Sequence, residues 1–105
     1  MATMKIDIAI ANNTVVCSPV SGHVRGHEGD DISWESNHKF SLFFALLTGR
    51  GEQNWPFTGS PAKVSEVTRF KGTLARSDEN SPPAYKYTVV IDGFPPLDPI
   101  IIVEK

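Results

Sequence analysis

The fold is decided by the last third of the chain, which reads YKYTVVIDG at residues 85–93 and PIIIV at residues 99–103. Tyrosine, valine and isoleucine are enriched in β-strands, and turn-forming residues separate the two runs. Asp92-Gly93 is a turn dipeptide, and Pro95-Pro96 cannot lie inside a hydrogen-bonded ladder. These residues predict a pair of closing β-strands joined by a turn-rich connection.

Strand-like patterns also run through the first two thirds of the chain. Apolar residues alternate with polar or small ones from Met4 to Ile10, which is the period of a strand with one buried face. Asn12-Asn13 predicts a turn into the next strand, and Gly72 predicts a bulge or bend within a later one. The strands expected after the first cover residues 14–17, 32–35, 40–47, 64–75, 84–91 and 100–103, and residues 64–75 form either one bent strand or two short ones.

Residues 40–47 differ from the other strands because they are apolar on both alternations. Phe40 and Leu42 face one way, while Phe43 and Leu47 face the other. A run of this kind suits a central strand that is covered on both sides. The sequence therefore predicts that both faces of this strand are buried.

Length and pattern together predict one all-β domain over residues 1–105. A chain of 105 residues has room for one core, and it buries roughly 65% of its unfolded surface, which suffices without a disulfide or a metal. We count seven or eight strands, no internal repeat and no helix. This combination is typical of a β-sandwich or barrel.

The composition excludes several classes of partner. The net charge is -2 and the lysines and arginines are scattered, so the basic surface of a nucleic-acid-binding protein is missing. No window approaches the roughly 20 apolar residues of a membrane span, and no signal peptide precedes the first strand, so we expect a cytoplasmic location. Cys17 is the only cysteine, which rules out an intrachain disulfide and predicts a core position.

The order of several short motifs is similar to that of the cupredoxin-like proteins. In that family a Gly-Asp turn leads into a strand bearing Trp, a His heads the next strand, and a Tyr-x-Tyr strand precedes the metal loop. The matching segments are Gly29-Asp30-Asp31-Ile32-Ser33-Trp34, Asn37-His38-Lys39-Phe40, Gly72-Thr73-Leu74 and Tyr85-Lys86-Tyr87-Thr88. The resemblance spans most of residues 26 to 103 and implies a Greek-key β-sandwich.

The same resemblance implies a scaffold without copper. His38 matches the family's first copper-binding histidine, but Val89 stands where the family has its cysteine and Asp92 stands near the place of the second histidine. A blue copper site needs a thiolate and two imidazoles, and valine cannot replace the thiolate. We therefore expect no cofactor and no electron transfer through type 1 copper.

Histidines and nearby acids leave a metal-binding protein as the alternative function. His23 and His27 have a His-x3-His spacing, which brings two imidazoles together when a helix carries it. The glycine-rich segment at residues 18–31 instead predicts a loop with solvated histidines. The alternative site consists of His23, His27 and His38, with Glu28, Asp30 and Asp31 as further oxygen donors.

An enzymatic function is not expected. The chain contains no Gly-x-Ser-x-Gly elbow, no phosphate-binding Walker loop and no His-Glu-x-x-His motif. A nucleophilic mechanism requires a nucleophile, a base and an orienting group, and no motif brings these together.

Two aromatic residues in a polar loop are the candidate partner-binding residues. Trp55 and Phe57 flank Pro56 within the long segment 49–63, where large apolar side chains either fold back as a plug or contact a partner. The partner would be another protein, a small ligand or a second copy of this chain. The sequence therefore predicts a non-catalytic binding or assembly module on a copper-free cupredoxin-like scaffold.

Overall fold

A computed structural model describes residues 2–48, 54–75 and 83–104 of the chain. These residues form an all-β fold with a short 3-10 turn at Val20–Gly22 and no α-helix. None of their segments is a helix long and apolar enough to cross a membrane. The seven strands found in this part are β1 (Thr3–Ala11), β2 (Thr14–Ser18), β3 (Val24–His27), β4 (Asp31–Thr48), β5 (Val64–Thr73), β6 (Ala84–Val90) and β7 (Ile100–Glu104).

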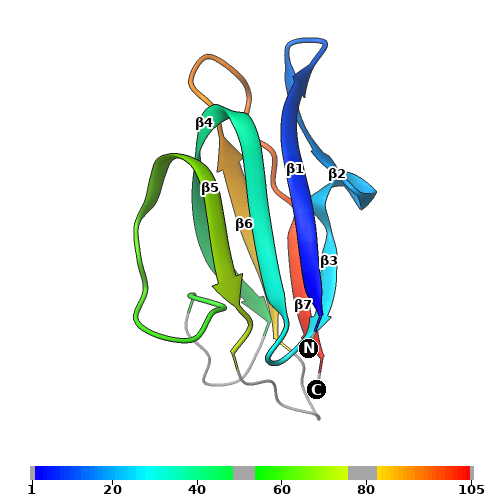
Figure 1. Ribbon diagram of the computed structural model, residues 1–105, viewed down its shortest axis with the longest axis vertical. Coiled ribbons are helices and arrows are strands. Elements are labelled where there is room, and N and C mark those ends of the chain that lie inside the picture. The colour runs from blue at the N-terminus through cyan, green and yellow to red at the C-terminus, as the bar shows by residue number, and fades with distance from the viewer. Residues whose placement is uncertain (1, 49–53, 76–82, 105) are drawn as a thin grey trace.

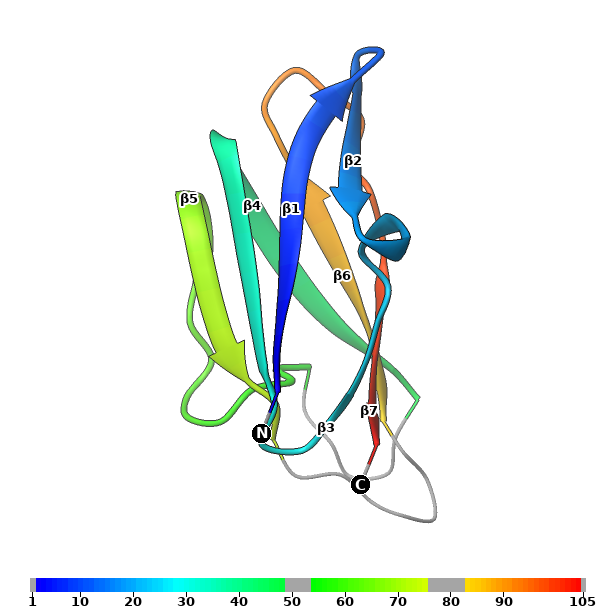
Figure 2. The same cartoon turned by 45° about the vertical axis from the view of Figure 1, so that its right-hand side comes forward.

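The strands form one mixed, curled sheet. Its order is β2-β1-β4-β6-β7-β3, and β5 also pairs with β4. The β1–β4 and β3–β7 pairs are parallel, whereas the other pairs are antiparallel. As the views in Figures 1 and 2 show, β4 rises beside β1, bends at one end of the molecule and returns beside β6. The sheet therefore wraps around its own core.

The 18-residue strand β4 belongs to both halves of this sheet. Its first half, from Asp31 to Ser36, lies between β1 and β5, and its second half pairs with β6 from Ser41 onward. The register with β5 shifts between Glu35 and Phe40, where the strand bends. Irregularities of this kind increase the local twist and bend a strand.

An aromatic cluster fills the core between the two halves. Trp34 is fully buried, and its ring lies 5.3 to 5.9 Å from four other aromatic rings. Most of these contacts are edge-to-face, the geometry that aromatic pairs favour. The cluster consists of Trp34, Phe44, Trp55, Phe57, Phe70 and Tyr87.

Both turns predicted from the sequence are present. Asn12 and Asn13 have positive φ angles of 51° and 59°, as the tight hairpin between β1 and β2 requires. The N–H of Phe94 bonds to the carbonyl of Ile91 at 3.1 Å, and Gly93 has a φ of 87°, which closes a turn after β6. The closing strands β6 and β7 pair antiparallel, as the sequence predicts.

The expectation that β4 is covered on both sides is wrong for residues 40–47. Phe40 and Leu42 are buried, but Phe43 is 58% exposed and Leu47 is 49% exposed. No second layer of described residues covers this outer face of the sheet. The run therefore exposes apolar side chains to solvent, and contiguous exposed apolar surface is a common feature of interaction sites.

Gly72 does not mark a bulge. Its pairing with Ile32 lies in a regular stretch of the β4–β5 ladder, and the irregular residue of β5 is Glu66, with a φ of 56°. A Cβ built on Gly72 would lie only 2.6 Å from two ring atoms of Phe57. Glycine is therefore needed here because the Phe57 ring packs directly against the strand.

A buried carboxylate fastens the start of β1 to the turn after β3. Asp30 accepts hydrogen bonds from the N–H groups of Ala2 and His27, both at 3.0 Å. The bond from Ala2 is the largest cause, and the bond from His27 the second, of a pKa of Asp30 below its usual value. Burial acts in the opposite direction and is outweighed.

Candidate functional site

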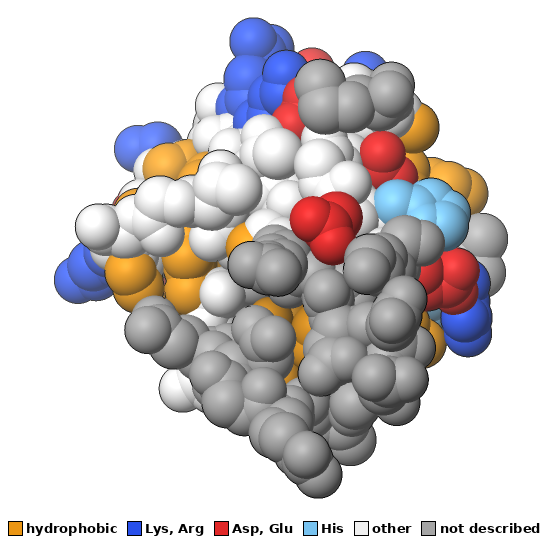
Figure 3. Space-filling view, turned by 90° about the horizontal axis from the view of Figure 1, so that it is seen from below, with side chains coloured by type: hydrophobic (Ala, Val, Ile, Leu, Met, Phe, Trp, Pro, Cys, Tyr) orange, Lys and Arg blue, Asp and Glu red, His pale blue; other side chains and the backbone are white. Residues whose placement is uncertain are grey.

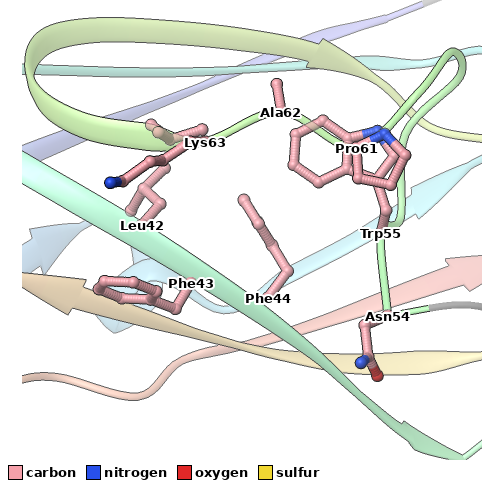
Figure 4. A pocket seen from close by; sticks show the side chains of 9 residues that line it. Leu42, Phe43, Phe44, Asn54, Trp55, Pro61, Ala62 and Lys63 are labelled. Atoms are coloured by element: carbon pink, nitrogen blue, oxygen red, sulfur yellow. The ribbon is translucent and has the colours of Figure 1, made fainter.

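The candidate site is a groove between the edge of β4 and the segment that leads into β5. Its volume is about 460 Å³, which lies within the range of small-ligand sites. Figure 4 shows residues of β4 along one wall, the segment at residues 61–63 along the other, and Trp55 with Asn54 closing one end. The lining residues are Leu42, Phe43, Phe44, Asn54, Trp55, Pro61, Ala62, Lys63 and Val64.

Trp55 forms a fixed aromatic wall of the groove. Its ring centroid lies 5.2 Å from that of Phe57, 5.4 Å from that of Phe44 and 6.1 Å from that of Phe70. The side chain is half-buried, so it both packs on the core and lines the groove. Trp55 therefore does both things that the sequence left open: it folds back on the core, and it offers a surface that a partner could contact. Its Nε1–H is covered and finds no acceptor among the residues that the structure describes.

The edge of β4 beside the groove has backbone groups that point away from β6. The N–H of Leu46 donates to Oδ1 of Asn54 at 3.0 Å, so it does not face Tyr85, its partner on β6. Peptide groups alternate in direction along a strand, so the N–H and C=O of Phe44 face the same side as those of Leu46. Tyr87, the β6 partner of Phe44, agrees with this, because its own N–H donates to Pro99 on the far side.

Among the residues that the structure describes, no further strand pairs with this part of the β4 edge. The ladder between β4 and β5 ends where Leu42 pairs with Val64. Beyond that point, the described residues place Asn54 on the N–H of Leu46 and put no loop backbone on Phe44. The groove therefore runs alongside a short stretch of β4 edge that no described strand covers.

The groove is apolar and has one cationic side chain. Lys63 is exposed and is the one ionisable residue among the nine that line it. Phe43 lines the groove and also belongs to the apolar outer face of β4. The outer face of the other half of the sheet differs, because ion pairs cover it: Glu35 lies 3.2 Å from Lys5 and 3.6 Å from Arg69.

Phe57 has to be removed from the partner-binding residues expected from the sequence. It is 4% exposed and lies inside the aromatic cluster, bridged by its backbone to Leu74. A ring so placed has no surface to present to a partner. Its ring packs edge-to-face against that of Trp55, with the two centroids 5.2 Å apart, and so helps to hold Trp55 in place.

The three histidines of the alternative metal site are not brought together. The chain is extended from Val24 to His27, so the four residue steps from His23 to His27 span roughly 13 Å along the strand direction. Nδ1 of His23 already accepts a hydrogen bond from the N–H of Ile100 at 3.1 Å. His38 is exposed at the bend of β4. Within residues 2–48, 54–75 and 83–104, no three His, Cys, Asp or Glu side chains cluster as a metal would require.

Neither Val89, which stands where the resemblance places the copper-binding cysteine, nor Cys17, the one cysteine of the chain, offers a metal-binding thiolate. Val89 is fully buried and pairs with Leu42 on one side and Leu97 on the other. Cys17 is buried on β2, and desolvation raises the pKa of its thiol to about 11. A thiol with so high a pKa is neither a nucleophile nor a ready metal ligand at neutral pH.

A second hollow lies on the outer face of β3 and β7. It has a volume of about 450 Å³ and is bordered by Val24, Arg25 and Ile102, with His23 and Ile100 at one end. Arg25, which lines this hollow, is already engaged in an ion pair with Glu104. At the end of the molecule that carries both termini, the described acidic and basic side chains in view are spread over the surface rather than gathered into one patch (Figure 3). The aromatic groove beside β4 is the better defined site.

The chain matches no protein-family model and no curated protein sequence. Sequence reasoning identified Trp55 as a candidate but missed Phe43, Asn54 and Lys63, which line the same groove. The two-sided apolar pattern of residues 40–47 was the available signal for Phe43. Asn54 and Lys63 are polar residues of a loop, and nothing in their neighbours distinguishes them from solvated side chains.

Proposed function

We propose that this protein is a non-catalytic binding module whose ligand occupies the groove beside β4. The observation that carries the proposal is the position of Trp55, which is held by the aromatic core and lines an open, apolar groove. A rigid aromatic wall offers a large contact area at little cost in conformational entropy. Its fixed position suits binding better than a flexible loop tip would.

The chemistry of the lining favours an apolar ligand with one polar or anionic group. Seven of the nine lining residues are hydrophobic, and the remaining two are Asn54 and Lys63. Binding sites commonly combine an apolar wall with a few polar groups that set the orientation of the ligand. The lining contains no nucleophile beside a base, which supports binding rather than catalysis.

We further propose that the scaffold is a copper-free, cupredoxin-like Greek-key sandwich. The curled all-β sheet, with Trp34 buried at its centre and His38 exposed at the bend of β4, supports this assignment. A metal-binding function has less support, because His23 and His27 lie at opposite ends of β3 and His38 lies on β4.

Two-dimensional NMR of the labelled protein with aromatic fragments tests the binding proposal. Indole and benzoate are suitable probes, since one is neutral and the other carries the anion that Lys63 favours. We expect saturable shifts of the backbone amides of Phe44 and Ala62 and of the Trp55 indole N–H. The amides of Lys71 and Arg69, on the charged face, serve as the internal control. Shifts confined to the hollow between β3 and β7, or no saturable shift at all, would refute the proposal.

A further inference from the structure

The polar groups on the open edge of β4 restrict what the groove can bind. The N–H and C=O of Phe44 and the C=O of Leu46 point toward the groove side of the strand, as the Asn54 contact and the β6 register require. These groups repeat every second residue, at roughly 6.8 Å, and alternate between donor and acceptor. An extended peptide backbone presents the complementary groups at the same spacing.

We propose that the groove binds a short extended peptide segment of a partner protein, which adds as a strand to the β4 edge at Phe44. The inference rests on the proposed function of the groove and specifies its ligand. Addition of a strand to an open sheet edge is a recurrent mode of peptide recognition, in which backbone bonds supply affinity and side-chain pockets supply specificity. The bound strand pairs with β4 beyond Leu42, in the part that β5 does not reach because β5 begins at Val64.

Asn54 shows that this edge accepts a substitute for a strand. Its side-chain carbonyl takes the bond from the N–H of Leu46 that a neighbouring backbone carbonyl would otherwise take. Open edges are a liability in soluble proteins and are usually covered or charged. Here Asn54 caps one position, and the next position, Phe44, is left beside an apolar groove. The bound segment is therefore short, of about three to five residues at the strand rise of roughly 3.3 Å.

The walls of the groove define which side chains the peptide carries. Side chains of an added strand alternate between the two faces of the sheet. On the outer face they would cover Phe43, and on the inner face they would contact Trp55. Lys63 adds a positive charge beside this path, so an acidic residue in the peptide is favoured. The expected ligand is an extended segment with alternating apolar residues and one Asp or Glu.

Selection from a random decapeptide library displayed on phage, with the whole protein immobilised, tests this inference. We expect enriched peptides with alternating apolar residues and an acid, and their binding should fall at least tenfold on F43S and on K63E. L47S is the matched control, because Leu47 is a similarly exposed apolar residue of the outer face of β4 but does not line the groove. Absence of enrichment, or equal loss on F43S and L47S, would overturn the inference.

Amide hydrogen exchange then separates strand addition from other modes of binding. In the free protein the Phe44 amide should exchange faster than those of Phe43 and Ala45, which face β6. A saturating enriched peptide should slow exchange at Phe44 at least tenfold. A peptide that shifts the groove resonances and leaves exchange at Phe44 unchanged overturns strand addition but retains the groove as a binding site. Loss of fragment binding as well would remove the proposed function itself.

Discussion

The close packing of the Phe57 ring on Gly72 allows the effect of G72A on the free energy of unfolding to be predicted. A methyl group placed on Gly72 would lie 2.6 Å from Cγ and Cδ1 of Phe57 and 2.9 Å from Cδ2. Carbon atoms normally approach to about 3.5–4.0 Å, so the ring would have to move by roughly 1 Å. The rings of Trp34, Phe44 and Trp55 lie with their centroids 5.1 to 5.8 Å from that of Phe57, so they oppose its displacement.

We therefore expect G72A to lower the free energy of unfolding by about 1–2 kcal/mol. Overpacking in a core costs roughly 1–3 kcal/mol, and replacing a strand glycine by alanine returns roughly 0.5–1 kcal/mol. For a domain of about 100 residues this corresponds to a midpoint lower by about 5–15 °C. F57A should cost about 3–5 kcal/mol, as expected for removal of a buried aromatic ring.

The double variant G72A/F57A provides the decisive comparison. With the ring removed, the new methyl group meets open space and its penalty disappears, so the double variant should be no less stable than F57A alone. Urea unfolding of all four proteins, followed by far-UV circular dichroism, measures the coupling, which we expect to be about 1–3 kcal/mol. Strictly additive costs, or a G72A protein as stable as the parent, would refute the packing described.

A control within the same fold is G26A. A Cβ on Gly26 would lie 2.7 Å from Cδ1 of the buried Leu74 and 2.8 Å from Cε of the half-buried Met4. Met4 can shift by rotation about its own bonds, and moving one methyl group of Leu74 displaces fewer atoms than moving the whole Phe57 ring. G26A should therefore cost less than G72A in the same unfolding experiment.

Three further predictions concern single polar groups. The pKa of Asp30 is lowered in the folded state, so its ionised carboxylate contributes fully to stability above pH about 4 and loses this contribution as the pH falls below that value. In urea unfolding at pH 7, 5 and 3, the difference in free energy of unfolding between the parent and D30N should therefore be smallest at pH 3. A difference that stays constant with pH would contradict this. The Cys17 thiol is buried, and its pKa is raised to about 11. It should therefore react with iodoacetamide at pH 8 far more slowly in the native protein than in urea, as followed by mass spectrometry. Equal rates would place the thiol at the surface. N54A should speed exchange of the Leu46 amide and cost about 0.5–1.5 kcal/mol, whereas N54D keeps the acceptor and should preserve protection; unchanged exchange in N54A would disprove the cap.

Most of the strands were predictable from residue patterns, but β3 lies within the segment 18–31 that was expected to be a loop, and β4 joins the two strands expected at residues 32–35 and 40–47. Alternation in β1, the Asn12-Asn13 turn and the β-branched run of β7 each specify structure within a few neighbouring residues. The burial of Trp34 and of Cys17 followed from the same local reasoning. Local signals were sufficient because backbone geometry and side-chain alternation act over short distances along the chain.

The groove was not predictable, because it depends on where separate strands end. The pattern of residues 40–47 indicated burial on both faces, but whether a strand is covered depends on a layer that other segments must supply. Gly72 was interpreted as a bulge, although its role is to admit the ring of Phe57 from a different segment. Asn54 caps Leu46 across a loop, and such long-range partners leave no local sequence pattern.

The continuous strand β4 determines how the described structure unfolds. Because its residues are shared by both halves of the sheet, neither half can detach without pulling apart the ladder of the other. The described strands therefore contain no boundary between two parts that could fold separately. Heating or denaturant should therefore disrupt the whole described structure in one step, and a protease should find either the intact fold or a fully accessible chain.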